Sequence, residues 1–186
     1  MMKKIFMMAV MAVAALTANA QQEAGSFSLQ PKVGLNVSKI TGEGTKTKAG
    51  FTAGVEGMYQ AAEKFGVSAA LMYSLQGYKV DGVDKAYNMH YLNIPILANY
   101  YVVKGLAVKA GIQPGFLVGA KHDGDSFSDN CKKFDFAIPV GLSYEISNVV
   151  IDARYNIGLT KTAKGDNVEK TKNSVFQFTV GYKFAL

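Results

Sequence analysis

Apolar and polar residues alternate along eight segments of this chain, and this alternation limits its fold more than any other feature. In the first segment, Phe27 and Leu29 alternate with Ser28 and Gln30. Side chains of a strand point to opposite faces in turn, so each segment predicts a strand with one apolar and one polar face. The eight predicted strands cover residues 27–37, 49–59, 65–75, 89–101, 106–118, 134–146, 149–160 and 174–186.

The chain opens with the features of an export signal. Lys3 and Lys4 precede an apolar run over residues 5–16 and the small-residue exit Ala18-Asn19-Ala20. We predict a signal peptide over residues 1–20, cleaved after Ala20, and a single domain over residues 21–186. The apolar run is too short to cross a bilayer as a helix. The positive charge of the remainder is mild and scattered, which argues against nucleic-acid binding.

Strand length and connection length together predict a barrel in a membrane. Each strand has about the 9–11 residues that a tilted transmembrane strand needs. Short connections (60–64, 102–105, 147–148) alternate with long ones (39–48, 76–88, 119–133, 161–173). This is the pattern of an outer-membrane barrel with short periplasmic turns and long outer loops. We therefore predict an all-β fold, an eight-stranded antiparallel up-and-down transmembrane β-barrel in the bacterial outer membrane.

Aromatic residues at the strand ends of the apolar face are typical of the girdles that such barrels place at the two membrane interfaces. The predicted girdle residues are Phe27, Tyr59, Phe65, Tyr100, Phe134, Tyr144 and Phe184.

The polar face suits the inside of this barrel. It is rich in small residues, and an eight-stranded barrel has an interior just wide enough for side chains to fill. Its charges also balance, and buried charges persist when they are paired. The predicted lumen network consists of Lys32, Lys109, Arg154 and Lys183 with Glu56, Asp135, Glu145 and Asp152. Strand adjacency suggests the pairs Lys109–Glu145, Lys183–Asp152 and Lys32–Glu56.

Several segments resemble the PorT-like outer-membrane β-barrel family of Bacteroidetes. They are residues 91–97 (YLNIPIL), 110–115 (AGIQPG), 134–136 (FDF), 154–159 (RYNIGL) and 181–184 (GYKF). The resemblance implies an outer-membrane location and insertion by the barrel-assembly machinery. The chain ends on Leu186, so Tyr182 or Phe184 would supply the aromatic of the C-terminal assembly signal. No activity is implied, although the founding member of the family is linked to protein secretion.

The sequence offers little catalytic or metal-binding chemistry. His90 and Ser74 have opposite strand parity and would not meet, and the acidic loop around His122 lacks the spacing of a calcium loop. We predict no catalytic residues, no cofactor and no metal. Cys131 is the single cysteine, and we expect it to be exposed in a polar loop.

The leading interpretation is a non-enzymatic outer-membrane barrel with a plugged lumen. Its outer loops would contact lipopolysaccharide or an unidentified surface partner. The lysines of the last long loop (Lys161, Lys164, Lys170 and Lys172) could meet anionic lipid head groups. The alternatives are a narrow solute channel, an accessory barrel in protein secretion, and a soluble periplasmic binder that resembles a lipocalin.

Overall fold

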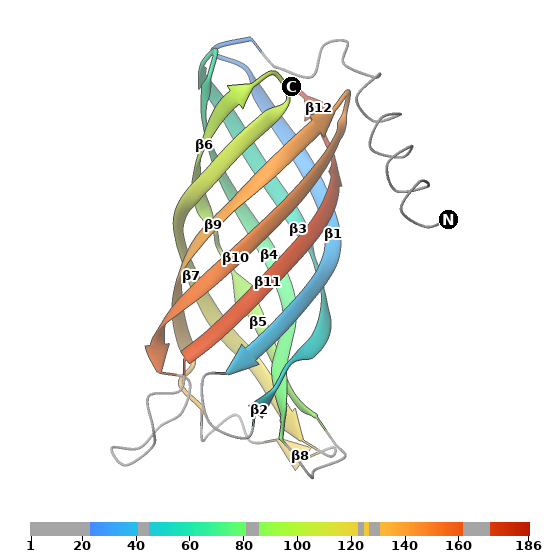
Figure 1. Cartoon of the computed structure of the whole chain (residues 1–186), viewed down its shortest axis with the longest axis vertical. Coiled ribbons are helices and arrows are strands. Elements are labelled where there is room, and N and C mark those ends of the chain that lie inside the picture. Colours follow the sequence, from blue (N-terminus) through green and yellow to red (C-terminus); the bar gives the residue numbers. More distant parts are fainter. Residues whose placement is uncertain (1–22, 41–44, 81–85, 123–124, 127–130, 162–171) are drawn as a thin grey trace.

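The computed structural model describes residues 23–40, 45–80, 86–122, 125–126, 131–161 and 172–186. The predicted signal peptide therefore lies outside the described residues. All regular elements of the described part are strands (Figure 1). They are β1 (Phe27–Ile40), β2 (Thr45–Lys46), β3 (Lys48–Ala62), β4 (Phe65–Val80), β5 (Tyr87–Asn93), β6 (Ile96–Val103), β7 (Leu106–His122), β8 (Asp125–Ser126), β9 (Phe134–Ile146), β10 (Val149–Lys161), β11 (Lys172–Tyr182) and β12 (Phe184–Ala185).

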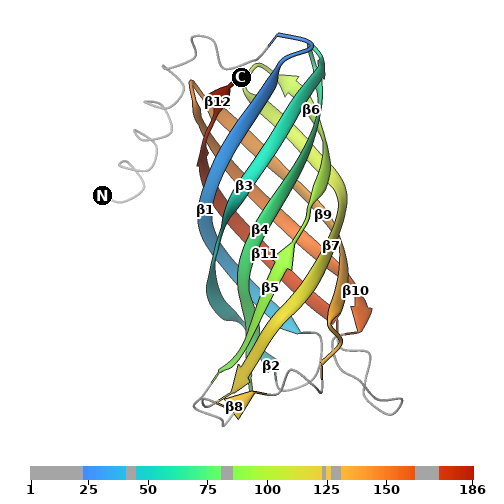
Figure 2. The ribbon, with the colours of Figure 1, turned by 180° about the vertical axis from the view of Figure 1, so that it is seen from behind.

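These strands form one closed antiparallel barrel. The wall runs in the order β1, β3, β4, β5 with β6, β7, β9, β10 and β11, and β11 pairs back onto β1 with Lys32 opposite Gly181, which closes it. β5 and β6 follow one another between β4 and β7 and act as one wall strand. Counted in this way, the described residues form the predicted eight-stranded up-and-down barrel. In Figures 1 and 2 the strands at the front of the barrel cross those at the back because all of them are tilted.

The barrel has two distinct ends. The turns after β3, β6 and β9 lie with the start of β1 and with β12 at one end, which we call the turn end (Figure 1). The opposite end, where β2 and β8 lie, is the loop end. No helix in the described part of the chain is long and apolar enough to cross a membrane.

The two faces of the wall follow the predicted parity. Outward residues such as Val33, Leu35 and Phe178 are between 51 % and 64 % exposed, whereas Lys32 and Asn36 are at most 2 % exposed. The apolar face therefore lies outside, and the polar face fills the lumen. This arrangement contradicts the lipocalin-like alternative, which requires an apolar interior.

Two features of the wall go beyond the simple pattern. At the loop end, β4 and β5 continue past the predicted boundaries to the pair Tyr78 and Tyr87, whose rings stack at 4.7 Å. Stacking of cross-strand aromatic rings stabilises this extension of the ladder. Between β5 and β6, Pro95 lacks the N–H that a ladder needs, and the strand is interrupted there.

Candidate functional site in the barrel lumen

Five charged side chains meet in the middle of the lumen, and we call them the central cluster: Lys32, Glu56, Lys109, Asp152 and Arg154. They come from β1, β3, β7 and β10. Lys32 Nζ lies 2.7 Å from Glu56 Oε1, and Lys109 Nζ lies 3.2 Å from the same oxygen. Asp152 accepts hydrogen bonds from Lys109 Nζ at 2.8 Å and from Arg154 Nε at 2.7 Å. All five side chains are at most 2 % exposed.

A second charged group lies closer to the turn end. Lys183 donates to Glu145, and the hydroxyl of Tyr101 donates to the other oxygen of Glu145 at 2.6 Å. Hydrogen bonds from both partners satisfy this buried carboxylate. The structure therefore divides seven of the eight predicted network residues into two groups.

The lumen contacts differ in part from those predicted by strand adjacency. Lys32 pairs with Glu56 as predicted. Lys109 pairs with Glu56 and Asp152 rather than with Glu145, and Lys183 pairs with Glu145 rather than with Asp152. The reason is register, because Lys109 lies opposite Gly141 on β9, whereas Glu145 lies nearer the turn that follows β9.

Asp135 is not part of either charged group. Its carboxylate accepts hydrogen bonds from the Thr160 hydroxyl and from the backbone N–H of Phe136, at 2.9 Å for the latter. Asp135 lies opposite Gly115, towards the loop end of β9. The predicted balance of four positive and four negative charges is therefore not kept within the central cluster.

Two glycines make room for the cationic side chains. A Cβ atom on Gly141 would lie 2.7 Å from Cγ of Arg154, and one on Gly181 would lie 2.8 Å from Cγ of Lys32. Each of these glycines lies directly across the ladder from the residue whose stem it accommodates. The small inward residues that the polar pattern shows therefore have a definite role, which is to admit long charged side chains.

A layer of neutral polar groups lies between the central cluster and the loop end. Asn36 donates to the hydroxyl of Ser74 at 2.7 Å, and Gln76 donates to the same hydroxyl at 2.8 Å. Asn156 donates to Gln177 Oε1 at 3.2 Å. Buried amides and hydroxyls need such partners to offset their loss of water.

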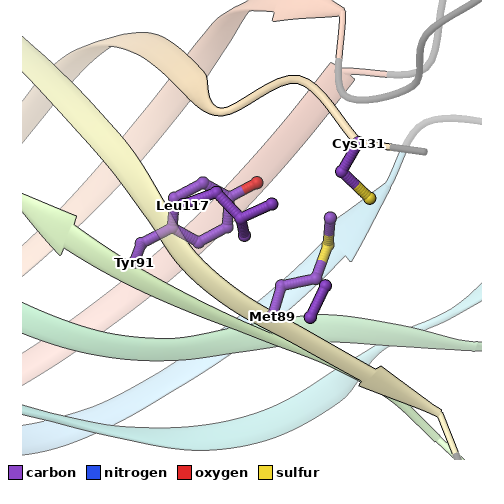
Figure 3. Packing of buried hydrophobic residues seen from close by; sticks show 5 residues of the cluster. Met89, Tyr91, Leu117 and Cys131 are labelled. Atoms are coloured by element: carbon purple, nitrogen blue, oxygen red, sulfur yellow. The ribbon is translucent and has the colours of Figure 1, made fainter. Parts of the chain in front are cut away.

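The expectation that Cys131 is exposed is wrong. Cys131 is 5 % exposed and packs with Met89, Tyr91, Leu117 and Ala120 near the loop end (Figure 3). Before β9 begins, the backbone N–H of Leu117 donates to the carbonyl of Lys133 at 2.7 Å, so this segment is held beside β7. The polar composition of the predicted loop gave no sign of this contact. The inward parity of Met89 and Leu117 was the one sequence signal for an apolar patch in the lumen.

The predicted girdle residues lie on the outer face, and six of them lie towards the turn end. Phe27 is opposite Tyr59 and Phe65 is opposite Tyr100 in the ladders. Phe134 lies nearer the loop end, where its ring meets that of Phe116 edge-on at 5.6 Å. Five further aromatics that the strand pattern places on the outer face also lie on this side, and the predicted girdle did not include them: Phe51, Tyr73, Phe116, Tyr155 and Phe176.

His90 also lies on the outer face, beside the outward aromatics nearer the loop end. It hydrogen-bonds to the hydroxyl of Tyr73 through Nδ1, whereas Ser74 is buried in the lumen. The two residues are on opposite faces of the wall, as parity predicts. The other predicted terminal aromatics, Tyr182 and Phe184, are outward and about half exposed, with ring centroids 4.8 Å apart.

A closed antiparallel wall that is apolar outside and polar inside defines a transmembrane β-barrel. The family model described as "Outer membrane protein beta-barrel domain" matches residues 19–164. The chain belongs to this family, and it is an outer-membrane protein.

Several solved structures share this fold. Neisserial surface protein A aligns with a TM-score of 0.59 at 16 % identity over 85 % of this chain and 97 % of its own. Ail, the attachment invasion locus protein of Yersinia pestis, gives 0.53 at 19 % identity over 87 % and 99 %. OprG of Pseudomonas aeruginosa gives 0.52 at 19 % identity over 89 % and 98 %. A comparison with curated proteins finds no significant match.

Proposed function

We propose that this outer-membrane barrel is a non-enzymatic surface protein whose lumen is sealed by its own side chains and whose loop end contacts molecules outside the cell. The observation that carries the proposal is the central cluster. Glu56 on β3 and Lys109 on β7 meet at 3.2 Å although other wall strands separate β3 from β7 in the sheet.

Contacts of this kind occupy the cross-section through which a solute would pass. An eight-stranded barrel has an interior that side chains can fill completely. Ion pairs from β1, β3, β7 and β10 converge here, and each is buried. Opening a path would require separating charges that are not in bulk water, and breaking a buried pair costs several kcal/mol.

Single-channel recording in planar bilayers tests the seal. We expect no discrete conductance steps from the wild-type barrel. The double variant Glu56→Ala/Lys109→Ala removes the cross-lumen pair and should conduct measurably, while Glu63→Ala/Lys64→Ala, in the turn after β3, should remain silent. Regular steps from the wild type would instead support the narrow solute channel.

The loop end favours anionic partners. Lys46, Lys79, Lys121, Lys132 and Lys172 are exposed there. The remaining lysines of the last predicted loop, Lys164 and Lys170, lie outside the described residues, as does the side chain of Lys161. Phosphate groups of lipopolysaccharide are the anions closest to this end of an outer-membrane barrel, so we propose that these lysines bind them.

Binding to lipid A vesicles tests this partner. Charge reversal of Lys46, Lys79, Lys121 and Lys172 to Glu should weaken binding and remove most of its salt dependence. Reversal of the two turn-end lysines, Lys64 and Lys104, is the matched control and should leave binding unchanged. Equal binding by both sets would exclude the loop-end lysines as the contact.

The PorT-like resemblance and the C-terminal aromatics lead to one further part of the proposal. We propose that the chain is a PorT-like barrel inserted by the barrel-assembly machinery through Tyr182 and Phe184. The double variant Tyr182→Ala/Phe184→Ala should accumulate unfolded in the periplasm, whereas Tyr144→Ala, also an outward tyrosine, should reach the outer membrane. Normal insertion of the double variant would contradict this role.

A further inference from the structure

The central cluster has an excess of one positive charge. It contains Lys32, Lys109 and Arg154 but only two carboxylates, Glu56 and Asp152. Of the other described lumen carboxylates, Glu145 is paired with Lys183 and Asp135 is held by Thr160 and Phe136. A buried charge without a counter-charge is strongly unfavourable in a site shielded from water.

Hydrogen-bond donors beside this excess charge also lack acceptors. Among the described residues, neither Nη1 nor Nη2 of Arg154 has a hydrogen-bond partner, and Arg154 is 1 % exposed. The hydroxyl of Thr179 is likewise buried and without a partner. Thr179 lies opposite Asp152 on one side and opposite Gly34 on the other, so it lies at the level of the cluster.

From these two observations we propose that the lumen binds a small monovalent inorganic anion, such as chloride, beside the guanidinium of Arg154. Such an ion would accept hydrogen bonds from Arg154 and from Thr179, and it would bring the cluster to neutrality. A water molecule could bridge Arg154 Nη2 and Glu56 Oε2, which are 3.9 Å apart, but it would leave the excess charge in place. The charge balance therefore selects an anion rather than a water.

This inference rests on the sealed lumen proposed above, because a wide aqueous lumen would solvate the excess charge. The two can fail separately, since conductance reports the seal and anion binding reports the ion. The size of the ion follows from the surroundings. Lys32, Lys109 and Arg154 already occupy the space between the walls, so the site admits a halide more readily than a phosphate or a carboxylate ligand.

The probe is bromide, and the protein is the mature chain purified in detergent. Crystals grown with sodium bromide should give an anomalous peak within about 3.5 Å of the Arg154 nitrogens. In solution, replacing gluconate with chloride or bromide at constant ionic strength should raise the Tm by about 3–5 °C once the halide is near ten times its Kd.

Three variants separate this site from general salt effects. Arg154→Gln removes the donors, and Lys32→Gln removes the excess charge but keeps the donors, so both should reduce or abolish the halide-dependent rise in Tm. Lys104→Gln, which removes a positive charge from an exposed turn, should keep the full rise. Loss of the bromide peak in Arg154→Gln crystals would support the site even if that variant is less stable.

Other results would overturn the inference. A wild-type Tm that does not depend on the anion, together with no bromide peak near Arg154, would show that the excess charge is relieved in another way. A halide effect of equal size in wild type and in Arg154→Gln would place the bound ion elsewhere.

Discussion

Glu56 and Lys109 approach to 3.2 Å across the lumen from strands that do not pair with each other. This contact joins opposite parts of the wall through side chains alone. The ladders hold neighbouring strands together, and the central cluster braces the cylinder across its interior. The stability of the barrel should therefore depend on a few inward charges as well as on its ladders.

Among these charges, Asp152 should have the largest effect on the free energy of unfolding when it is removed. Asp152→Asn keeps the size of the side chain but leaves Lys109 and Arg154 without their shared carboxylate. We expect a loss of about 3–5 kcal/mol in the free energy of unfolding, because removing one partner leaves buried charges uncompensated. Arg154→Ala should cost less, because two cations and two carboxylates remain, and the exposed Lys104→Ala should cost almost nothing. Urea unfolding in detergent measures this order, and equal small effects for all three variants would remove the network as a source of stability.

Tyr101 and Tyr100 form a natural matched pair on β6. Tyr101 points into the lumen and donates to Glu145, whereas Tyr100 points outward and is 54 % exposed. Tyr101→Phe should lower the free energy of unfolding by about 1–3 kcal/mol, because a buried carboxylate loses a donor. Tyr100→Phe should have little effect, and similar losses in the two variants would contradict the inward position of Tyr101.

The burial of Cys131 predicts slow modification of its thiol. A maleimide reagent should react with the folded protein at least about ten times more slowly than with the denatured chain, because only the exposed thiolate reacts readily. The variant Cys131→Ser/Lys132→Cys moves the thiol by one residue to an exposed position and should react rapidly when folded. Rapid labelling of native Cys131 would show that the lumen packing at the loop end is open.

The lipid-facing surface should tolerate charge according to depth. Val33 is outward next to Lys32, at the level of the central cluster, and Val102 is outward beside the turn that follows β6. Val33→Arg should cost about 2–4 kcal/mol on folding into phospholipid bilayers, whereas Val102→Arg should cost about 0–1 kcal/mol. Folding titrations in vesicles give both values, and the opposite order would place the membrane elsewhere on the wall.

The wall could be predicted from sequence because its signal is local. Alternation along each segment determines which side chains point outward, so Phe27 and Lys32 could be assigned to their faces without knowing the neighbouring strands. The break at Pro95 departs from the single strand predicted over residues 89–101. Pro114 and Pro139 lie inside the continuous strands β7 and β9, so the missing backbone donor of a proline does not by itself locate a break.

Apart from the pair Lys32–Glu56 on neighbouring strands, the contacts inside the lumen could not be predicted in the same way. The partner of Lys109 depends on the tilt and stagger of all the strands between β3 and β10, and these accumulate around the barrel rather than along the chain. Cys131 was assigned wrongly for a related reason. The path of the chain before β9 is fixed by a hydrogen bond between the backbones of Leu117 and Lys133, and no local sequence pattern predicts this bond.

The seam between β1 and β11 joins the first and last wall strands of the chain. Until β11 is in place, the N–H and C=O groups along the free side of β1 have no ladder partners, and hydrocarbon cannot supply any. A barrel that lacks β11 is therefore unstable within the bilayer. The barrel closes only after the C-terminal strand β11 has been added. A chain truncated before residue 172 should therefore not fold stably in the membrane.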